Sequence, residues 1–235
     1  MNKNKKIVAV ISGGMDSTLS AFIMKDLGYE VVAVHFSYGQ KTEKKELESF
    51  NKITKSLNIS DDKKFVFDIK SLFYQIGKGT TSLIDENIKV PTDGIHVNPE
   101  NKNLEIPNSY VPYRNGIFLS IATAIAEKEN AQGITIGVVE EDSSGYPDCR
   151  ENFMQSFEKT INLGTKDETK LEIFRPLINL KKSEIVKKAL ELNVPLEFTW
   201  SCYQNSDKAC GVCDSCRLRL KGFEEANTED KIEYM

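Results

Sequence analysis

The sequence predicts an α/β protein with a doubly wound, mostly parallel sheet and a small metal-binding module at its C-terminal end. Short apolar runs without polar alternation take turns with segments of helical spacing, which is typical of a sheet buried on both faces. A Gly-Gly turn follows the first apolar run, and four cysteines crowd between positions 202 and 216. We therefore predict a main domain over residues 1–195 and a zinc module with its tail over 196–235.

The first third of the chain repeats strand and helix patterns in turn. The continuous β-branched run 7–11 is typical of a buried parallel strand, and apolar residues at helical spacing then follow up to Gly28, a common helix end. A second apolar run leads into a charged helical segment. The patterns predict strands at 7–11, 31–36 and 63–69, and helices at 17–27 and 43–57.

The remainder of the main domain begins with a long irregular stretch. Residues 76–113 are rich in Gly, Pro, Asn and Asp and show no sustained period, so we expect a long loop, of the kind that forms lids or stays disordered. After it the alternation resumes. The patterns predict helices at 117–126, 152–163 and 182–192, a buried strand at 133–139, and a short edge strand or turn at 173–178, interrupted by Pro176.

Composition narrows the class of function. Hydrophobic residues make up 40% and charged residues 28%, as in ordinary globular proteins, and the net charge of -4 gives no field that attracts a polyanion. We expect no obligatory nucleic-acid partner. The chain shows no membrane span and no signal-peptide core, and its cysteine spacing is typical of metal ligands in a reducing compartment. We therefore predict a cytoplasmic protein that acts on small molecules.

The segment 12–18, with the sequence SGGMDST, joins the first strand to the first helix. Free N–H groups at a helix start, glycines and hydroxyls make this a candidate phosphate site, although a Gly-Gly pair alone more often makes only a turn. Neither a Walker A loop nor a dinucleotide fingerprint is present. The segment resembles the SGG-x-DS-[ST] signature of PP-loop ATP pyrophosphatases, which split ATP between its α and β phosphates. The resemblance implies that the loop binds ATP through Ser12, Gly13, Gly14, Met15, Asp16, Ser17 and Thr18.

The cysteine cluster has the spacing C-x7-C-x2-C-x2-C. Four thiolates can fill all positions of a tetrahedral ion, so the site is expected to be structural. Spacing alone leaves zinc and an iron–sulfur cluster open, and we favour one structural zinc. Arg217 and Arg219 lie just past the ligands, where they could place positive charge near a substrate. Cys149 stands apart and is expected to be a packed thiol rather than a nucleophile. The predicted ligands are Cys202, Cys210, Cys213 and Cys216.

Further motifs accompany the loop and the cysteines: YGQ at 38–40, YVPYRN at 110–115, SGYPDCR at 144–150, Lys182, and TWSCY before CGVCDSC. Over almost the whole chain these resemble the 7-cyano-7-deazaguanine synthase family. The resemblance implies a cytoplasmic, homodimeric ligase of queuosine biosynthesis that forms carbon–nitrogen bonds. It would use ATP and ammonia to convert 7-carboxy-7-deazaguanine to the nitrile, by adenylating the carboxylate and then the amide.

The resemblance also assigns roles to single residues. It implies that Asp16 helps to hold Mg2+ and that Lys182 and Arg114 stabilise the phosphoryl charge. Asp148 and Arg150 follow a predicted strand, at the end where open α/β sheets bind ligands, and are expected to face the deazaguanine or its activated carboxylate. Two more residues are expected to contact the nucleotide: Phe36 and Gln40. His35 is expected to be a packed histidine without a catalytic role.

Two positions depart from the family pattern. Tyr113 stands where the family loop carries glycine, in VPGRN, and Lys41-Thr42 stands where the family carries Arg-His. These departures leave open an alternative, a paralogue that adenylates a deazaguanine and joins it to another acceptor, such as a protein amine in anti-phage defence. A catalytically idle nucleotide-binding partner is disfavoured by the intact loop with Asp16. A tRNA thiolase is disfavoured because no additional RNA-binding domain is visible.

Overall fold

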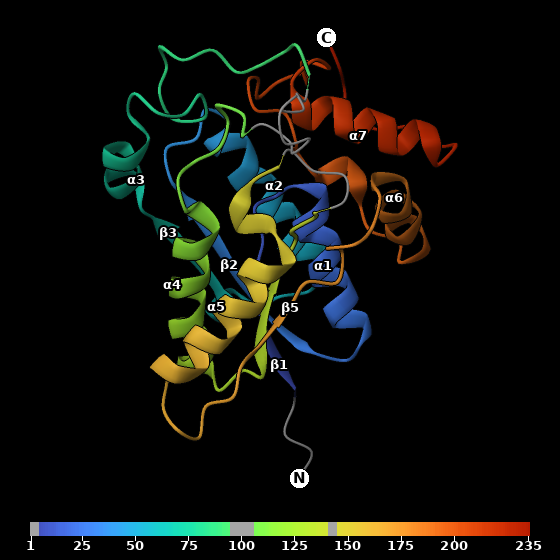
Figure 1. Ribbon diagram of the computed structural model, residues 1–235. Helices are drawn as coiled ribbons and strands as arrows, with labels where there is room; N and C mark the ends of the chain where they lie inside the picture. The colour runs from blue at the N-terminus through green and yellow to red at the C-terminus, as the bar shows by residue number, and fades with distance from the viewer. Residues whose placement is uncertain (1–4, 95–105, 141–144) are drawn as a thin grey trace.

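The computed structural model describes residues 5–94, 106–140 and 145–235, and its centre is a five-stranded parallel sheet in the order β3-β2-β1-β4-β5 (Figure 1). Seven α-helices surround the sheet within the described ranges. In chain order the elements are β1 Lys6–Val10, α1 Met15–Asp26, β2 Glu30–Ser37, α2 Glu43–Ser56, β3 Lys64–Asp68, α3 Lys70–Gly77, α4 Arg114–Glu129, β4 Gly133–Ile136, α5 Glu151–Gly164, β5 Glu172–Phe174, α6 Lys182–Glu191 and α7 Asp214–Glu225.

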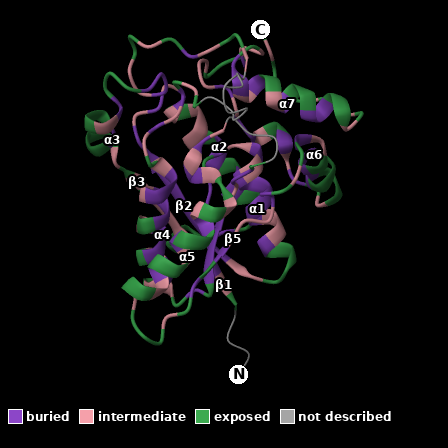
Figure 2. Ribbon diagram, in the orientation of Figure 1, coloured by how far each residue is buried: buried purple, intermediate pink, exposed green. Residues whose placement is uncertain are grey.

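Helices cover both faces of the sheet, and β1 shows why its sequence has no polar alternation. Ile7 and Ala9 pack with apolar residues of α1 and α2, whereas Val8 and Val10 pack with residues of α4 and α5 on the opposite face. The sheet is accordingly buried along its central strands (Figure 2). A strand that is apolar on both sides needs a layer of helices on each face. The predicted doubly wound α/β fold is therefore confirmed.

Most predicted elements appear with shifts of a few residues at their ends. The predicted 173–178 element is the edge strand β5, which ends at Phe174, before Pro176. Two helices were not predicted: α3, whose last two residues occupy positions 76 and 77 of the expected long loop, and α7, inside the cysteine module. Positions 78–94 and 106–113 carry turns but no helix or strand, whereas the rest of the predicted loop, 95–105, lies outside the described residues.

The strand order places a topological switch point between β1 and β4. Chain connections leave β1 towards β2 on one side, and β4 joins β1 from the other side. In open α/β sheets the carboxyl ends of two such strands border a ligand-binding crevice. Gly137, directly after β4, lies so close to the start of α1 that a side chain there would collide with the backbone of Asp16 and Ser17.

The C-terminal module packs on the main sheet domain rather than apart from it. Phe223 of α7 shares an apolar cluster with Ile185 and Val186 of α6. Trp200 N donates a hydrogen bond to Gly13 O at 2.9 Å, so the module touches the glycine loop directly. The domain boundary at residue 195 stays a prediction. Among the described residues, no helix combines the length and the apolar character that a membrane crossing requires.

Candidate active site

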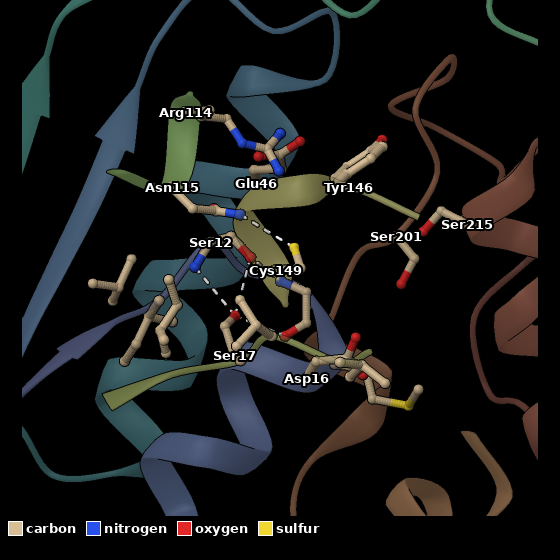
Figure 3. Close-up of a pocket in the computed structure, with 18 of the residues that line it drawn as sticks. Ser12, Asp16, Ser17, Glu46, Arg114, Asn115, Tyr146, Cys149, Ser201 and Ser215 are labelled. Carbon is tan, nitrogen blue, oxygen red and sulfur yellow. Dashed lines mark hydrogen bonds between the residues drawn. The ribbon is translucent and has the colours of Figure 1, made fainter. Parts of the chain in front are cut away.

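A cavity of about 240 Å³ opens at the carboxyl ends of β1 and β4, where the strand order predicts a ligand site (Figure 3). Its walls come from the glycine loop, the end of β2, the start of α4 and the C-terminal module. Predicted and unpredicted residues therefore meet in one place. The predicted site residues that line it are Ser12, Gly14, Met15, Asp16, Ser17, Phe36, Arg114 and Lys182.

The glycine loop owes its shape to Gly13. Its φ of 95° is a left-handed conformation that side chains disfavour, and a Cβ there would lie 2.6 Å from the backbone oxygen of Glu46. Glycine thus lets α2 approach the loop. Ser12 and Ser17 tie the two ends of the loop together through a 3.0 Å contact between their hydroxyl oxygens. Thr18 lies behind the cavity wall, where its hydroxyl donates to Gly14 O at 2.8 Å.

The start of α1 forms one end of the cavity. Met15, Asp16 and Ser17 occupy the first helical turn, whose N–H groups have no acceptor within the helix, and all three residues line the cavity. Together with the positive end of the helix dipole, these groups form an anion site. The geometry therefore suits the phosphates of a nucleotide.

Lys182 and Asp16 meet at this end of the cavity. Lys182 begins α6 and is buried, and its Nζ lies 2.5 Å from Asp16 Oδ2. The other carboxylate oxygen, Asp16 Oδ1, is buried and has no hydrogen-bond partner among the described residues. An orphaned carboxylate oxygen beside an anion site is a chemically suitable ligand for Mg2+. Asp16 therefore fits its predicted part in holding that ion.

Helix α7 packs against Lys182 from behind. A Cβ added at Gly222 would lie 2.8 Å from Lys182 Cβ and 3.1 Å from its carbonyl carbon. Only a glycine allows the two helices to approach this closely without displacing the lysine. The helix of the cysteine module thus helps to fix the position of Lys182.

Arg114 lies at the other end of the cavity, well away from Asp16 (Figure 3). Its Nη1 donates to Tyr38 Oη at 2.9 Å, and its guanidinium lies 5.5 Å from the ring centre of Tyr38 and 5.9 Å from that of Tyr146. Aromatic faces stabilise a cation held in this way. Arg114 and Lys182 both line the cavity, and their expected part in stabilising the phosphoryl charge stays a prediction.

Asp148 and Cys149 stand beside the start of α4. Asn115 N donates to Asp148 Oδ2 at 2.9 Å, and Asn115 Nδ2 lies 3.3 Å from Cys149 Sγ. Burial raises the pKa of Asp148 and raises the pKa of the Cys149 thiol to about 12. Cys149 lines the cavity as a protonated thiol, which is a poor nucleophile. Asp148 does not line the cavity, and Arg150 is exposed at the start of α5, outside the cavity wall.

Glu46 is a cavity residue that the sequence did not single out. It projects from α2, and its carboxylate accepts hydrogen bonds from Gln40 Nε2 at 2.9 Å and from Thr42 Oγ1 at 2.7 Å. Burial raises the pKa of this carboxyl, and the two hydrogen bonds oppose the effect. Gln40, predicted to contact the nucleotide, lies behind Glu46 and does not line the cavity. Thr42, which stands at one of the two positions that depart from the family pattern, therefore holds the Glu46 carboxylate through this hydrogen bond.

Aromatic rings form one wall of the cavity. Phe36, at the end of β2, stacks on Phe118 of α4 with ring centres 4.2 Å apart and planes 9° apart. Tyr38 packs against the same Phe118 ring at 5.6 Å. A flat heterocycle finds an apolar surface here. Phe36 thus has the environment expected of a base-contacting residue.

Tyr113, the other departure, points away from the cavity. It has a φ of 55°, a left-handed conformation in which glycine is favoured, directly before α4. Its ring lies over Gly116, where a Cβ would come within 2.5 Å of it, and makes an edge contact with Phe153. Tyr113 is half exposed and does not line the cavity. The large side chain therefore leaves the binding site open.

Arg217 and Arg219, just past the cysteine ligands, both form hydrogen bonds within the protein. Arg219 is buried and forms two hydrogen bonds with Asp230, at 2.6 and 2.9 Å, so that its charge is neutralised within the module. Arg219 lines the cavity, so its expected place near a substrate stays a prediction, but the Asp230 carboxylate balances its charge. Arg217 turns outward and donates to the backbone oxygens of Val212 and Thr92. His35 is a buried core residue, as expected.

The four predicted cysteine ligands converge. Their sulfur atoms all lie within 4.8 Å of one another, and the sulfurs of Cys210 and Cys216 are 3.9 Å apart. A tetrahedral Zn2+ with thiolate ligands requires sulfur separations of about 3.8 Å. Backbone N–H groups of Asn205 and Cys210 point at Cys202 Sγ at 3.4 Å, which favours a thiolate there. The cluster can hold a metal ion with all four positions filled by protein.

Several lining residues were missed although the sequence contains a signal for them. Tyr38, Asn115, Tyr146 and Tyr203 line the cavity, and each belongs to a motif noted above, but none had been given a role. Their positions within these motifs were the sequence signal that could have marked them as cavity residues. Glu46 lies in no such motif.

Comparisons with known proteins identify the family of the chain. The family model described as "Queuosine biosynthesis protein QueC" matches residues 6–227. A 7-cyano-7-deazaguanine synthase of Nautilia profundicola is 59% identical over 230 residues, covering 98% of each chain. The protein of that name from Sulfurimonas denitrificans is 57% identical over 233 residues, covering 99% of each chain.

Likeness to solved structures is more remote. A crystal structure of a 4-thiouridine synthetase–RNA complex with bound ATP superposes with a TM-score of 0.49 and 18% identity, covering 95% of this chain and 50% of that chain. The family assignment depends on the near-complete match of the family model and of the curated relatives. This chain belongs to the QueC family of queuosine biosynthesis proteins.

Proposed function

We propose that this chain is a 7-cyano-7-deazaguanine synthase, an ATP-dependent ligase that converts 7-carboxy-7-deazaguanine and ammonia to the nitrile. The observation that carries the proposal is its near-full-length similarity to relatives of that name. The cavity supports it, because a phosphate-binding loop and an aromatic wall lie on one continuous surface. ATP and a flat heterocyclic acid are the substrates that such a surface suits.

The chemistry needs two activations. A carboxylate is a poor electrophile, since attack by ammonia would have to expel oxide. One carboxylate oxygen attacks the α-phosphorus of ATP and pyrophosphate leaves; ammonia then attacks the carbonyl carbon, loses a proton and expels AMP, giving the amide. Adenylation of the amide oxygen by a second ATP releases a second pyrophosphate. Loss of AMP and two protons then yields the nitrile.

The protein contributes position and charge to both activations. Backbone amides of the first turn of α1 hold the phosphates, and Lys182 stabilises the negative charge that develops at the α-phosphate. Asp16 orients Lys182 through one oxygen and offers the other to Mg2+, which would supply positive charge to the phosphates when bound. Because both activations need the same groups, one site serves both.

The cysteine cluster serves as a scaffold in this proposal. Four protein ligands fill the coordination sphere of a zinc ion and leave no position for a substrate. The zinc module instead holds the loop through the hydrogen bond from Trp200 to Gly13, and holds Lys182 through Gly222. We also propose a homodimer, as the family resemblance implies. The alternative with a protein amine as acceptor is favoured by no observation, and Tyr113 lies outside the cavity.

The proposal predicts a specific dependence of ATP cleavage. The purified protein, incubated with ATP and Mg2+, is expected to release pyrophosphate only when 7-carboxy-7-deazaguanine is present, and to release AMP only when ammonium is present as well. Release of ADP in place of AMP would contradict adenylation. Indifference to the deazaguanine would contradict the substrate.

A further inference from the structure

The end of the cavity away from Asp16 carries two opposite charges side by side. Glu46 and Arg114 both line the cavity there and lie close together in the close-up (Figure 3). They influence each other electrostatically, yet neither forms an ion pair within 4.0 Å with any charged group that the structure describes. Two charges that face one cavity without neutralising each other are suited to a ligand with both donors and acceptors.

The Glu46 carboxylate is held in a fixed orientation. Thr42 Oγ1 donates to its Oε1 and Gln40 Nε2 donates to its Oε2, so each oxygen is anchored from behind. A carboxylate oxygen has more than one acceptor site, and each keeps capacity for a second donor. Gln40 is in turn fixed because Tyr38 N donates to its Oε1 at 2.9 Å. The two carboxylate oxygens of Glu46 therefore form a pair of preorganised acceptors that face the cavity.

The Arg114 guanidinium supplies donors next to these acceptors. Among the described residues only Tyr38 engages the guanidinium by a hydrogen bond, through Nη1, and the rings of Tyr38 and Tyr146 hold the plane of the group. The remaining N–H groups of a guanidinium form a rigid fork of donors. The end of the cavity thus presents donors beside two acceptors, next to the stacked rings of Phe36 and Phe118.

This order of groups matches one edge of 7-deazaguanine. Its six-membered ring presents the acceptor O6, then the donors N1–H and the 2-amino group, in a row. The N1 and 2-amino edge lies on the far side of the ring system from C7, which carries the reacting carboxylate. A ring bound with this edge at Glu46 directs its carboxylate towards the glycine loop. Adenine presents a donor and then an acceptor on the same edge, and its N1 lone pair would face a carboxylate.

We propose that Glu46 and Arg114 form the subsite that recognises the guanine-like edge of the substrate, with Glu46 accepting from N1–H and the 2-amino group and Arg114 donating to O6. This inference deepens the proposed function and rests on it. It gives Arg114 a part in substrate binding in place of the phosphoryl contact expected from the sequence. Gln40 and Thr42 act as positioning residues for the Glu46 carboxylate.

The test is the variant Glu46→Gln, which keeps the shape and replaces an acceptor by a donor. Glu48→Gln on the same helix is the matched control, since Glu48 is exposed and pairs with Lys52. The dissociation constants of 7-carboxy-7-deazaguanine and of ATP are measured separately by calorimetry, independently of turnover. We expect Glu46→Gln to weaken binding of the deazaguanine about 10- to 100-fold and ATP less than about threefold. The control is expected to match the wild type for both.

A ligand analogue gives a second readout, which holds even if the variant folds poorly. The wild type is expected to bind the analogue without the 2-amino group at least about tenfold more weakly than the substrate, and Glu46→Gln is expected to lose most of this preference. Weaker binding of ATP alone in Glu46→Gln, or a wild type indifferent to the 2-amino group, would overturn the inference. A wild type that binds the deazaguanine with this preference but forms no product would instead contradict the proposed function.

Discussion

Lys182 Nζ lies 2.5 Å from Asp16 Oδ2, although 166 positions separate the two residues in the chain. Asp16 belongs to the glycine loop, whereas Lys182 begins α6, near the C-terminal module. The contact brings the positive charge of a buried lysine to the anion site at the start of α1. It thereby links the phosphate-binding end of the cavity to the elements that carry the cysteine cluster.

Replacing Lys182 by methionine is expected to reduce kcat about 10²- to 10³-fold, because the transition state loses a preorganised positive charge. The binding of the deazaguanine is expected to change little, since the lysine lies at the phosphate end. Steady-state kinetics of AMP release give both values. Lys187→Met, an exposed position on the same helix, serves as the control, and equal losses in both variants would exclude the assigned role.

Gly222→Ala is expected to lower kcat by roughly 10- to 100-fold, because the added methyl group displaces Lys182 from Asp16. Alanine favours helix formation by about 1 kcal/mol over glycine, so loss of helix α7 would not explain such a result. Gly164→Ala is the comparison, since a Cβ there meets open space. If Gly222→Ala retains full kcat with unchanged circular dichroism, the packing of α7 does not position the lysine.

Replacing Cys213 by serine is expected to remove the bound metal and to lower the free energy of unfolding by on the order of 3 kcal/mol. The KM for ATP is expected to rise as well, because Trp200 would no longer hold Gly13 in place. Elemental analysis should give about one zinc per chain for the wild type. Cys149→Ser, outside the cluster, should keep its zinc. Iron in place of zinc, or full metal content in Cys213→Ser, would contradict the assignment.

His35 makes stability depend on pH. It is fully buried, its Nδ1 donates to Ile11 O at 2.9 Å, and burial lowers its pKa below the ordinary value. Below about pH 6.5 the His35 side chain binds a proton in the unfolded chain but not in the folded protein. Its contribution to the free energy of unfolding therefore falls as the pH drops, by up to about 1.4 kcal/mol per pH unit. Above that pH it is constant.

Denaturant titrations between pH 5 and 8 can check this effect. His35→Gln is expected to be less stable than the wild type at pH 7.5, and the difference is expected to shrink as the pH falls towards 5, because glutamine takes up no proton. A difference that stays constant over the whole range would show that His35 does not control the acid side of the stability curve.

Much of the fold followed from the sequence because its signals are local. The apolar run of β1 is continuous since helices cover both faces of the sheet. The cysteine spacing predicted the cluster in which the four sulfur atoms converge. Helix α3 was not predicted because its eight residues form too few turns to show a helical period of apolar residues. Helix α7 was not predicted because its segment looks polar. One of its buried positions is occupied by Arg219, which is paired with Asp230, rather than by an apolar residue.

The site was harder to predict where a role depends on long-range packing. Acidic residues stand at 43, 46 and 48 of α2, and nothing in their pattern says which one enters the cavity. That choice follows from Gly13, which lets α2 approach the loop with Glu46 nearest. Asp148 was expected to face the substrate, yet it accepts a hydrogen bond from the start of α4. Its position depends on a contact between distant segments.

The most direct test of the proposed reaction is the mass of its product. The purified protein is incubated with ATP, Mg2+, 7-carboxy-7-deazaguanine and 15N-labelled ammonium, and both small molecules and intact protein are analysed by mass spectrometry. We predict a nitrile that contains one 15N atom, together with AMP, and an unchanged protein mass. A product that stops at the amide, or a deazaguanine attached to protein, would contradict the proposed function.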